Sequence, residues 1–270
     1  MWKLLAVCAA TMLGAAAARA QGDEVPFVVT PDNVTLAMLQ LAKVGPEDYL
    51  IDLGSGDGRI VITAARKFGA RGLGVELVAD LVAKSREAAQ QAGVAQKAHF
   101  REQDLFKTDL SPATVITMYL LPEVNLQLRP RILQLRPGTR IVSHDWDMGE
   151  WEPDRTITVE APDKPVGRDK VSKVHLWVVP ARVDGAWCGT GKWKGATLRM
   201  QQSFQKFRAE ISEAQGTRAF DGRIGGNVLR VSGGLTFTAD GARLKATHAA
   251  GKYSALKGAT FTRMRGQSCK

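Results

Sequence analysis

The most informative stretch of this sequence is Asp52-Leu53-Gly54-Ser55-Gly56-Asp57-Gly58-Arg59. It follows a short apolar run, residues 49–51, and precedes a segment with a helical pattern, residues 60–68. This order predicts a strand, a tight turn and a helix. Because glycine has no Cβ atom, glycines at every second position let the backbone adopt positive φ and let a ligand come close.

The carboxylate of Asp52 distinguishes this turn from a dinucleotide-binding turn. The dinucleotide fingerprint is G-x-G-x-x-G, and it places phosphates at the N-terminus of the following helix. The spacing here is D-x-G-x-G-x-G. A carboxylate at the mouth of the turn favours a cationic ligand group and repels a pyrophosphate. The alternative is a generic glycine turn of an α/β protein.

Two further carboxylates end the next two predicted strands. Glu76 lies 24 residues after Asp52, close to the ~20-residue offset at which an acidic side chain reaches ribose hydroxyls. Asp104 follows the third strand, where a carboxylate can accept a hydrogen bond from the amino group of adenine. Each residue alone is an ordinary solvated strand end. Three at consecutive strand ends predict a site, since open α/β sheets bind ligands at that edge.

The patterns between residues 26 and 180 alternate between strand and helix, which predicts a parallel sheet covered by helices. An extended arm, Pro26–Pro31, precedes the first helix, which Asp32 or Thr30 can cap. The predicted helices are 33–44, 58–68, 79–92 and 125–135, and the predicted parallel strands are 49–52, 71–76, 98–103, 114–120 and 140–144. Segments 156–160 and 173–179 are predicted to complete a seven-stranded sheet as an antiparallel pair.

The last third of the chain has a different pattern. From residue 183 onward, short alternating runs are separated by glycine turns, predicted at 221–222, 225–226 and 240–241. We expect a small antiparallel β sandwich or barrel with Trp187 and Trp193 in its core. The predicted domains are therefore 21–180 and 183–270.

The first 20 residues have the pattern of a secretory signal peptide. A basic start is followed by an apolar stretch, residues 4–17, and by Ala18-Arg19-Ala20, which fits an A-x-A cleavage site. The protein is then periplasmic or secreted if the leader is cleaved, and membrane-anchored if it is retained. No later apolar stretch is long enough to span a bilayer. Outside the leader, Cys188 and Cys269 form an even pair, which favours a disulfide over two separate thiols in an oxidising compartment.

The net charge of +10 lies in the last third of the chain. Residues 181–270 hold 16 Lys+Arg and 5 Asp+Glu, a charge of +11, whereas residues 21–180 hold 19 and 22, a charge of −3. This asymmetry predicts an anionic surface or an acidic partner for the β domain, and a solvated basic face is the alternative. No nucleic-acid partner and no metal site are predicted.

Residues 26 to about 160 resemble the class I S-adenosylmethionine (SAM)-dependent methyltransferases, which have a seven-stranded Rossmann-like sheet. The closer likeness is to the family of the ATP synthase c-subunit and adenine nucleotide translocase lysine methyltransferases. It rests on the arm at residues 26–30, the loop at 52–61 and the strand end at 74–76. The resemblance implies SAM as the methyl donor and a protein lysine as the acceptor.

The resemblance also implies which residues form the site. Those expected to bind the cofactor are Asp52, Gly54, Ser55, Gly56, Asp57, Gly58, Glu76, Asp104, Leu105 and Thr30. Tyr119, at the end of the fourth strand, is the candidate catalytic residue, because it can shape a lysine channel or accept an N–H hydrogen bond. Base- and amide-modifying enzymes use an Asn-Pro-Pro-Tyr-like turn here, and this chain lacks its Asn/Asp. His144 ends the fifth strand on the same rim, and we interpret it as structural.

Two other functions fit the sequence. One is a methyltransferase acting on a small molecule or a lipid. The other is a SAM-binding envelope scaffold whose basic β domain binds anionic surfaces.

Overall fold

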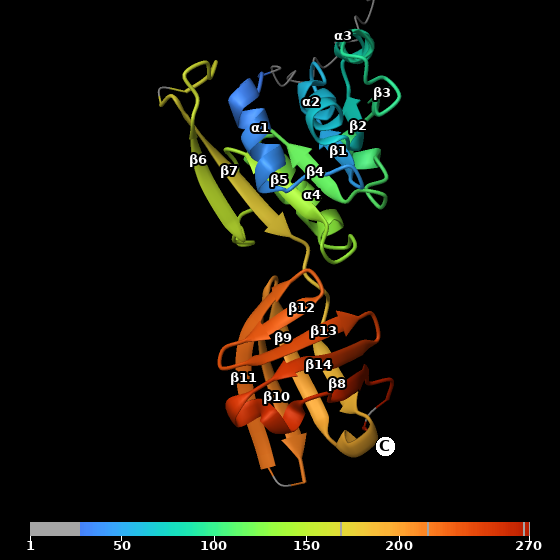
Figure 1. The fold of residues 1–270 in the computed structure, drawn as a ribbon, viewed down its shortest axis with the longest axis vertical. Helices are drawn as coiled ribbons and strands as arrows, with labels where there is room; N and C mark the ends of the chain where they lie inside the picture. Colours follow the sequence, from blue (N-terminus) through green and yellow to red (C-terminus); the bar gives the residue numbers. More distant parts are fainter. Residues whose placement is uncertain (1–27, 168, 215, 267, 270) are drawn as a thin grey trace, which may run out of the picture.

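The structure is a computed structural model that describes residues 28–270 except 168, 215, 267 and 270. The predicted leader, residues 1–20, and the start of the predicted arm lie outside the described residues. Two bodies follow one another along the chain, an α/β part and a β-barrel (Figure 1). This is the predicted fold class.

The α/β part is built on one seven-stranded sheet with the order β3-β2-β1-β4-β5-β7-β6. The strands are β1 (Tyr49–Leu53), β2 (Arg71–Glu76), β3 (Ala98–Glu102), β4 (Val115–Met118), β5 (Arg140–His144), β6 (Arg155–Glu160) and β7 (Val171–Val178). The first five strands are parallel, and β7 pairs antiparallel with both β5 and β6. The predicted antiparallel pair at the sheet edge is confirmed.

Helices cover both faces of this sheet. They are α1 (Asp32–Leu41), α2 (Arg59–Phe68), α3 (Ala79–Gln91) and α4 (Pro122–Ile132). Apolar residues of the first three helices form one core with β1 and β3, and α4 packs on the other face with Trp151 and Trp177. Burial on both faces explains why β1 and β4 are almost wholly apolar in sequence.

The predicted bounds of two helices, the first and the fourth, are wrong by up to three residues. The first helix starts at Asp32 after Pro31 and ends at Leu41, and neither Thr30 nor Asp32 caps it with its side chain. The fourth helix starts at Pro122 instead of residue 125. Proline lacks an N–H group but has a helical φ, so it is favoured in the first turn of a helix. Pro122 is therefore the first residue of α4, although it was predicted to end the preceding strand.

The barrel closes in the order β10-β11-β12-β13-β14-β15-β8-β9, with each neighbouring pair antiparallel. Its strands are β8 (Gly185–Gly189), β9 (Thr197–Ser203), β10 (Lys206–Glu213), β11 (Gly216–Gly225), β12 (Val228–Val231), β13 (Leu235–Asp240), β14 (Arg243–Ala249) and β15 (Thr260–Arg263). Trp187 and Trp193 are buried in its core, as predicted. A disulfide joins Cys188 in β8 to Cys269, also as predicted.

The turn predicted at residues 221–222 does not exist, because both residues lie inside β11. Gly222 pairs with Phe207 on one side and Val231 on the other. A Cβ atom at this position would lie 2.2 Å from the carbonyl oxygen of Arg230. Glycine therefore permits close strand packing here, and the real turn is at Gly226, where φ is +60°.

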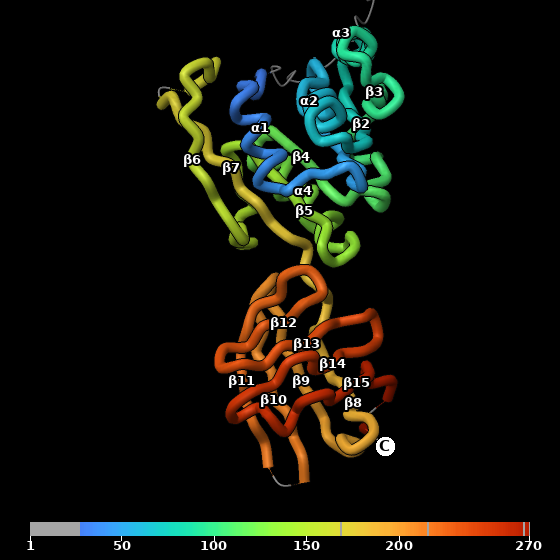
Figure 2. The backbone as a smooth tube through the Cα atoms, viewed as in Figure 1, coloured from blue at the N-terminus to red at the C-terminus, as the bar shows by residue number. Residues whose placement is uncertain are grey.

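The chain crosses once between the two bodies, through residues 179–184 (Figure 2). β7 is antiparallel to β5, and its last residue, Val178, pairs with Arg140 at the start of β5. The barrel therefore follows the sheet on the side where the parallel strands begin, opposite their carboxyl ends. The backbone N–H of Ala181 donates to the carbonyl of Gly226 in the barrel. The barrel therefore leaves the carboxyl edge of the sheet uncovered.

Side chains fix this junction. Phe204, at the turn between β9 and β10, stacks on Trp151 of the α/β part with ring centroids 6.1 Å apart, and the guanidinium of Arg129 lies 5.6 Å above its ring. Two cations of the barrel pair with acidic residues of the α/β part, Lys206 with Glu152 at 2.7 Å and Arg223 with Asp154 at 3.6 Å. Two of the basic side chains of the barrel thus form ion pairs with the α/β part of the same chain. An external anionic partner for the barrel stays a prediction.

None of the helices within the described residues is long and apolar enough to cross a membrane.

Candidate functional site

The glycine loop after β1 has a backbone that other residues do not readily adopt. Gly54, Gly56 and Gly58 have φ values of +72°, +52° and +78°. A Cβ atom on Gly58 would lie 2.7 Å from the ring of Phe100. The amides of Gly54 and Ser55 donate to the carbonyl of Val75 in β2, both at 3.0 Å. The loop is therefore held against β2 in an open turn that needs its glycines.

Asp52 lies at the base of this loop and is 2% exposed. Its Oδ1 atom accepts a hydrogen bond from the hydroxyl of Thr117 in β4 at 2.7 Å. Burial raises the pKa of Asp52 from 3.8 to about 7, although the Thr117 bond opposes this, and the nearby charges of Asp57 and Glu76 add to it. A cationic ligand would relieve this cost, because it favours the ionised carboxylate.

Glu76 lies at the end of β2 and bonds to the same loop. Its Oε2 accepts the N–H of Gly56 at 3.0 Å, and its Oε1 accepts the N–H groups of Leu77 and Val78 at 2.8 and 3.1 Å. These bonds orient the carboxylate. Each oxygen of a carboxylate has two acceptor positions, so Oε2 can also accept from a ligand hydroxyl.

Asp104 and Leu105 follow β3. The Oδ1 atom of Asp104 accepts the N–H of Phe106 at 2.8 Å and so caps a short 3₁₀ turn, Leu105–Lys107. Leu105 is partly buried against the core on the α4 face of the sheet. The structure thus places all three predicted carboxylates at the carboxyl ends of adjacent strands, β1, β2 and β3.

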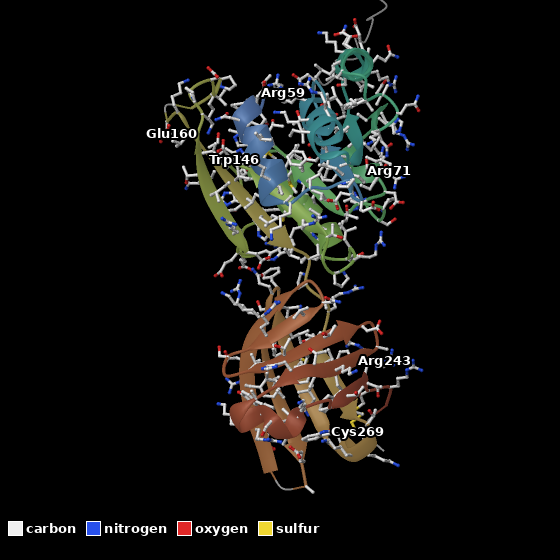
Figure 3. All side chains as sticks on the ribbon, in the orientation of Figure 1. Arg59, Arg71, Trp146, Glu160, Arg243 and Cys269 are labelled. Carbon is white, nitrogen blue, oxygen red and sulfur yellow. A yellow bond between two sulfur atoms is a disulfide. The ribbon has the colours of Figure 1, made fainter. Side chains whose placement is uncertain are left out.

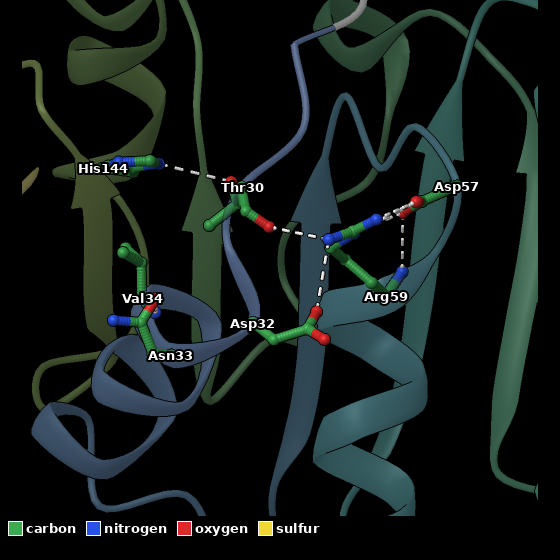
Figure 4. Close-up of polar contacts among 7 residues, drawn as sticks. All are labelled: Thr30, Asp32, Asn33, Val34, Asp57, Arg59 and His144. Atoms are coloured by element: carbon green, nitrogen blue, oxygen red, sulfur yellow. Dashed lines mark hydrogen bonds and ion pairs between the residues drawn. The ribbon is translucent and has the colours of Figure 1, made fainter. Parts of the chain in front are cut away.

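Arg59 joins the glycine loop to the N-terminal arm (Figure 4). Its guanidinium donates to Asp57 Oδ2 at 2.6 Å, to Asp32 Oδ1 at 3.2 Å and to the carbonyl of Thr30 at 3.0 Å. The hydroxyl of Thr30 lies 3.3 Å from His144 Nδ1. The predicted residues Asp57 and Thr30 thus both contact Arg59, which was not among the predicted site residues although it follows the loop directly.

Tyr119 lies beyond the end of β4, beside the end of β5. Its ring lies 3.9 Å from that of His144, centroid to centroid, and its hydroxyl donates to Asp145 Oδ2 at 3.4 Å. Burial raises the pKa of Tyr119 to about 12, and the charge and hydrogen bond of Asp145 act in the same direction. Near pH 7 Tyr119 is therefore a neutral phenol that can donate or accept a hydrogen bond.

His144 is fully buried, and both ring nitrogens have hydroxyl neighbours. Nε2 lies 2.8 Å from Ser172 Oγ, and Thr30 is near Nδ1. Burial lowers the pKa of His144 to about 4, against the attraction of Asp145. The residue is neutral near pH 7, and its ring packs against that of Tyr119.

Asp145 was not predicted as a site residue, although it lies at the end of β5 as the other three carboxylates lie at the ends of their strands. It lies beside Tyr119, and the ammonium of Lys164 is 2.7 Å from its Oδ2 atom. Lys164 comes from the loop between β6 and β7, and nothing in its sequence neighbourhood predicts this contact.

Exposed apolar side chains also gather at this edge. Among the described residues, the exposed large apolar side chains are Leu77, Val78, Phe106, Leu121, Leu126, Trp146, Val166 and Val171. They lie in the segments after the parallel strands, in the first half of α4 or around the β6–β7 loop. In Figure 3 the labelled Trp146 lies on the α/β part, away from Arg243 and Cys269 on the barrel. At the carboxyl ends of the parallel strands, exposed apolar side chains thus surround the carboxylates described above, and we call them the apolar rim.

Comparison with known proteins gives the family. Residues 52–155 match the family model described as the ANTKMT methyltransferase domain. A protein-lysine N-methyltransferase of Saccharolobus islandicus (strain REY15A) is 42% identical over 138 residues, which are 50% of this chain and 86% of that protein. This chain belongs to that family of SAM-dependent methyltransferases. The adenine nucleotide translocase lysine N-methyltransferase of Mus musculus is 36% identical over 133 residues, 48% of this chain and 56% of that enzyme.

A solved structure agrees with this assignment. The RNA methyltransferase of Salinibacter ruber, in complex with S-adenosyl-L-homocysteine (SAH), is 52% identical. It covers 58% of this methyltransferase and 96% of its own chain, with a TM-score of 0.53. The similarity is to the α/β part, and the chain spans only about half the length of the mouse relative.

The residues at the glycine loop fit SAM. Glycines in the turn let a ligand approach the backbone closely, Asp52 offers a buried carboxylate to a cation, and Glu76 Oε2, which accepts one N–H, has a second acceptor position for a hydroxyl. SAM supplies a methyl group on a positively charged sulfur. The chain's own contribution is to bind, orient and exclude water, which is where most of the acceleration in such a displacement arises.

Proposed function

We propose that this methyltransferase is a protein-lysine N-methyltransferase. The observation that carries the proposal is the group at the ends of β4 and β5, where Tyr119 and Asp145 share one hydrogen bond and a lysine ammonium already fits. The archaeal relative with 42% identity, a protein-lysine N-methyltransferase, supports the same acceptor.

We propose that Asp52, Glu76 and Asp104 hold SAM together with the glycine loop, with Ser55, Asp57, Leu105 and Thr30 completing the site. Leu121 and Trp146, both more than 40% exposed, then border the acceptor entrance. An apolar entrance disfavours the ammonium form of a lysine and so lowers its pKa, which supplies the neutral amine that methyl transfer requires.

RNA is the second candidate acceptor, because the Salinibacter ruber protein is named an RNA methyltransferase. Binding RNA requires cations near the reactive site to neutralise phosphates. Residues 21–180 have a net charge of −3, and the basic barrel is attached at the opposite edge of the sheet. The charge distribution therefore favours a protein acceptor over RNA.

The test is to incubate the protein with methyl-labelled SAM and a cell extract, and to separate protein, RNA, lipid and small metabolites. We expect the label in protein, and none with the Gly56→Val variant. Label mainly in RNA or lipid would replace the proposed acceptor by that class. No label in any fraction, with SAH binding intact, would favour the scaffold function.

A further inference from the structure

Asp145 follows β5 in an uncommon backbone conformation and is fixed on one side. Its φ is +61°, a value that few residues other than glycine adopt and that often marks a functional position. Its N–H donates to the carbonyl of Lys173 at 2.7 Å, and its Oδ1 atom accepts the N–H of Lys173 at 3.0 Å. One oxygen of the carboxylate is thus committed to β7, and Oδ2 lies near the hydroxyl of Tyr119 and, at 3.5 Å, Nε2 of His144.

Lys164 brings its ammonium to that second oxygen. Nζ lies 2.7 Å from Asp145 Oδ2 and donates to the carbonyl of Val171 at 2.8 Å, and the side chain is only 11% exposed. Lysine is almost never buried unless it is paired. The hydroxyl of Tyr119 donates to the same Oδ2 atom. This arrangement is already a binding site for a lysine ammonium, and a lysine of the same chain fills it.

The loop that carries Lys164 forms one wall of a cleft of about 560 Å³. The wall residues next to Lys164 are Pro162, Asp163 and Pro165. The cleft is also lined by Pro31 and Arg59, and Arg59 is bound to the glycine loop through Asp57. The cleft therefore adjoins both the loop that carries Lys164 and, through Arg59, the glycine loop.

We infer that Asp145 is the carboxylate that binds the ammonium of the acceptor lysine before that lysine loses its proton, and that Lys164 occupies this position until an acceptor displaces it. The inference rests on the proposed lysine acceptor and deepens it, because it names the recognising group and a competitor built into the chain. Lys164 thereby weakens acceptor binding and selects acceptors that make further contacts along the cleft and the apolar rim.

The experiment measures binding of a short fluorescent oligolysine to the full chain by anisotropy, without SAM. If Lys164 holds Asp145 about nine-tenths of the time, its removal strengthens oligolysine binding about tenfold. We expect this gain in Lys164→Gln and no gain in Lys164→Arg, which keeps the charge. Lys67→Gln is the matched control, since it makes the same charge change at an exposed position of α2 away from this loop. In the double variant Asp145→Asn with Lys164→Gln, the gain should disappear.

Equal tightening in Lys164→Gln and Lys67→Gln would assign the effect to net charge and overturn the inference, and so would an unchanged gain in the double variant. Thermal unfolding and SAH affinity show whether each variant is folded. The two proposals fail separately. Methylation of protein lysine with no effect of Lys164 removes the inference alone, whereas label in RNA or lipid, with the binding shifts present, removes the proposed acceptor.

Discussion

Replacing Asp52 by asparagine separates the effect of this carboxylate on the free energy of unfolding from its effect on the affinity for SAM. Burial raises its pKa from 3.8 to about 7. Between these two values the folded protein holds a proton that the unfolded chain has lost, so the free energy of unfolding decreases as the pH rises through this window. At ~1.4 kcal/mol for each pKa unit, the ionised carboxylate destabilises the unloaded protein by about 4 kcal/mol at pH 7 and above.

Asparagine keeps the shape of the side chain and its acceptor oxygen for Thr117, but it cannot ionise. We expect Asp52→Asn to raise the free energy of unfolding at pH 8 by about 2–4 kcal/mol, the shortfall being the unpaired amide N–H. At pH 4 the difference should nearly vanish. Urea unfolding between pH 4 and 8 measures this directly, and Glu47→Gln on the exposed surface is the control.

The same variant should lose affinity for SAM, measured by calorimetry at pH 8. Because a cation favours the ionised carboxylate, wild-type affinity should rise about tenfold between pH 6 and 8, with no comparable rise in Asp52→Asn. The reasoning is refuted if the variant is no more stable than wild type at pH 8. Unchanged SAM affinity in the variant would show that Asp52 is not the partner of the cation.

Three further predictions concern the other parts of the molecule. Glu76→Ala should weaken SAM and SAH alike, by about 1.5–3 kcal/mol or roughly tenfold to a hundredfold, because both contain the ribose; calorimetry showing an effect on SAM only would mean that Glu76 contacts the sulfonium end. Phe204→Ala should weaken the contact between the barrel and the α/β part by about 2–3 kcal/mol, so that the two parts unfold in two separate thermal transitions while methyl transfer persists. A single unchanged transition would show that the stack of Phe204 on Trp151 does not hold the junction. Thiol labelling of the denatured, unreduced protein from its native compartment should find Cys188 and Cys269 unreactive, and two free thiols there would contradict both the bridge and the predicted export.

Most of the fold could be predicted because local patterns determine it. The glycine loop, the apolar strands and the alternation of strands and helices are each encoded within a few residues, and so are the three carboxylates that end β1, β2 and β3. Boundaries were predicted less well where one residue type has two uses. Pro122 starts a helix although proline also ends strands, and Gly222 lies within a strand although glycine also forms turns.

The part of the site that could not be predicted depends on contacts between distant segments. Arg59 contacts Thr30, which lies 29 positions earlier in the chain, and Lys164, in the loop between β6 and β7, pairs with Asp145 after β5. No local pattern specifies such partners. Asp145 was within reach of the sequence, since the rule that selected Asp52 and Glu76 applies equally to the residue after β5.

The most direct measurement of the central claim is to locate the transferred methyl group. Protein labelled from SAM by the wild-type enzyme is digested, and tandem mass spectrometry identifies the modified residue, with Gly56→Val as the inactive control. The account predicts methyl groups on the ε-nitrogen of lysine and none with the variant. Methyl groups on arginine, glutamine or carboxylate side chains, or labelling that survives Gly56→Val, would contradict it.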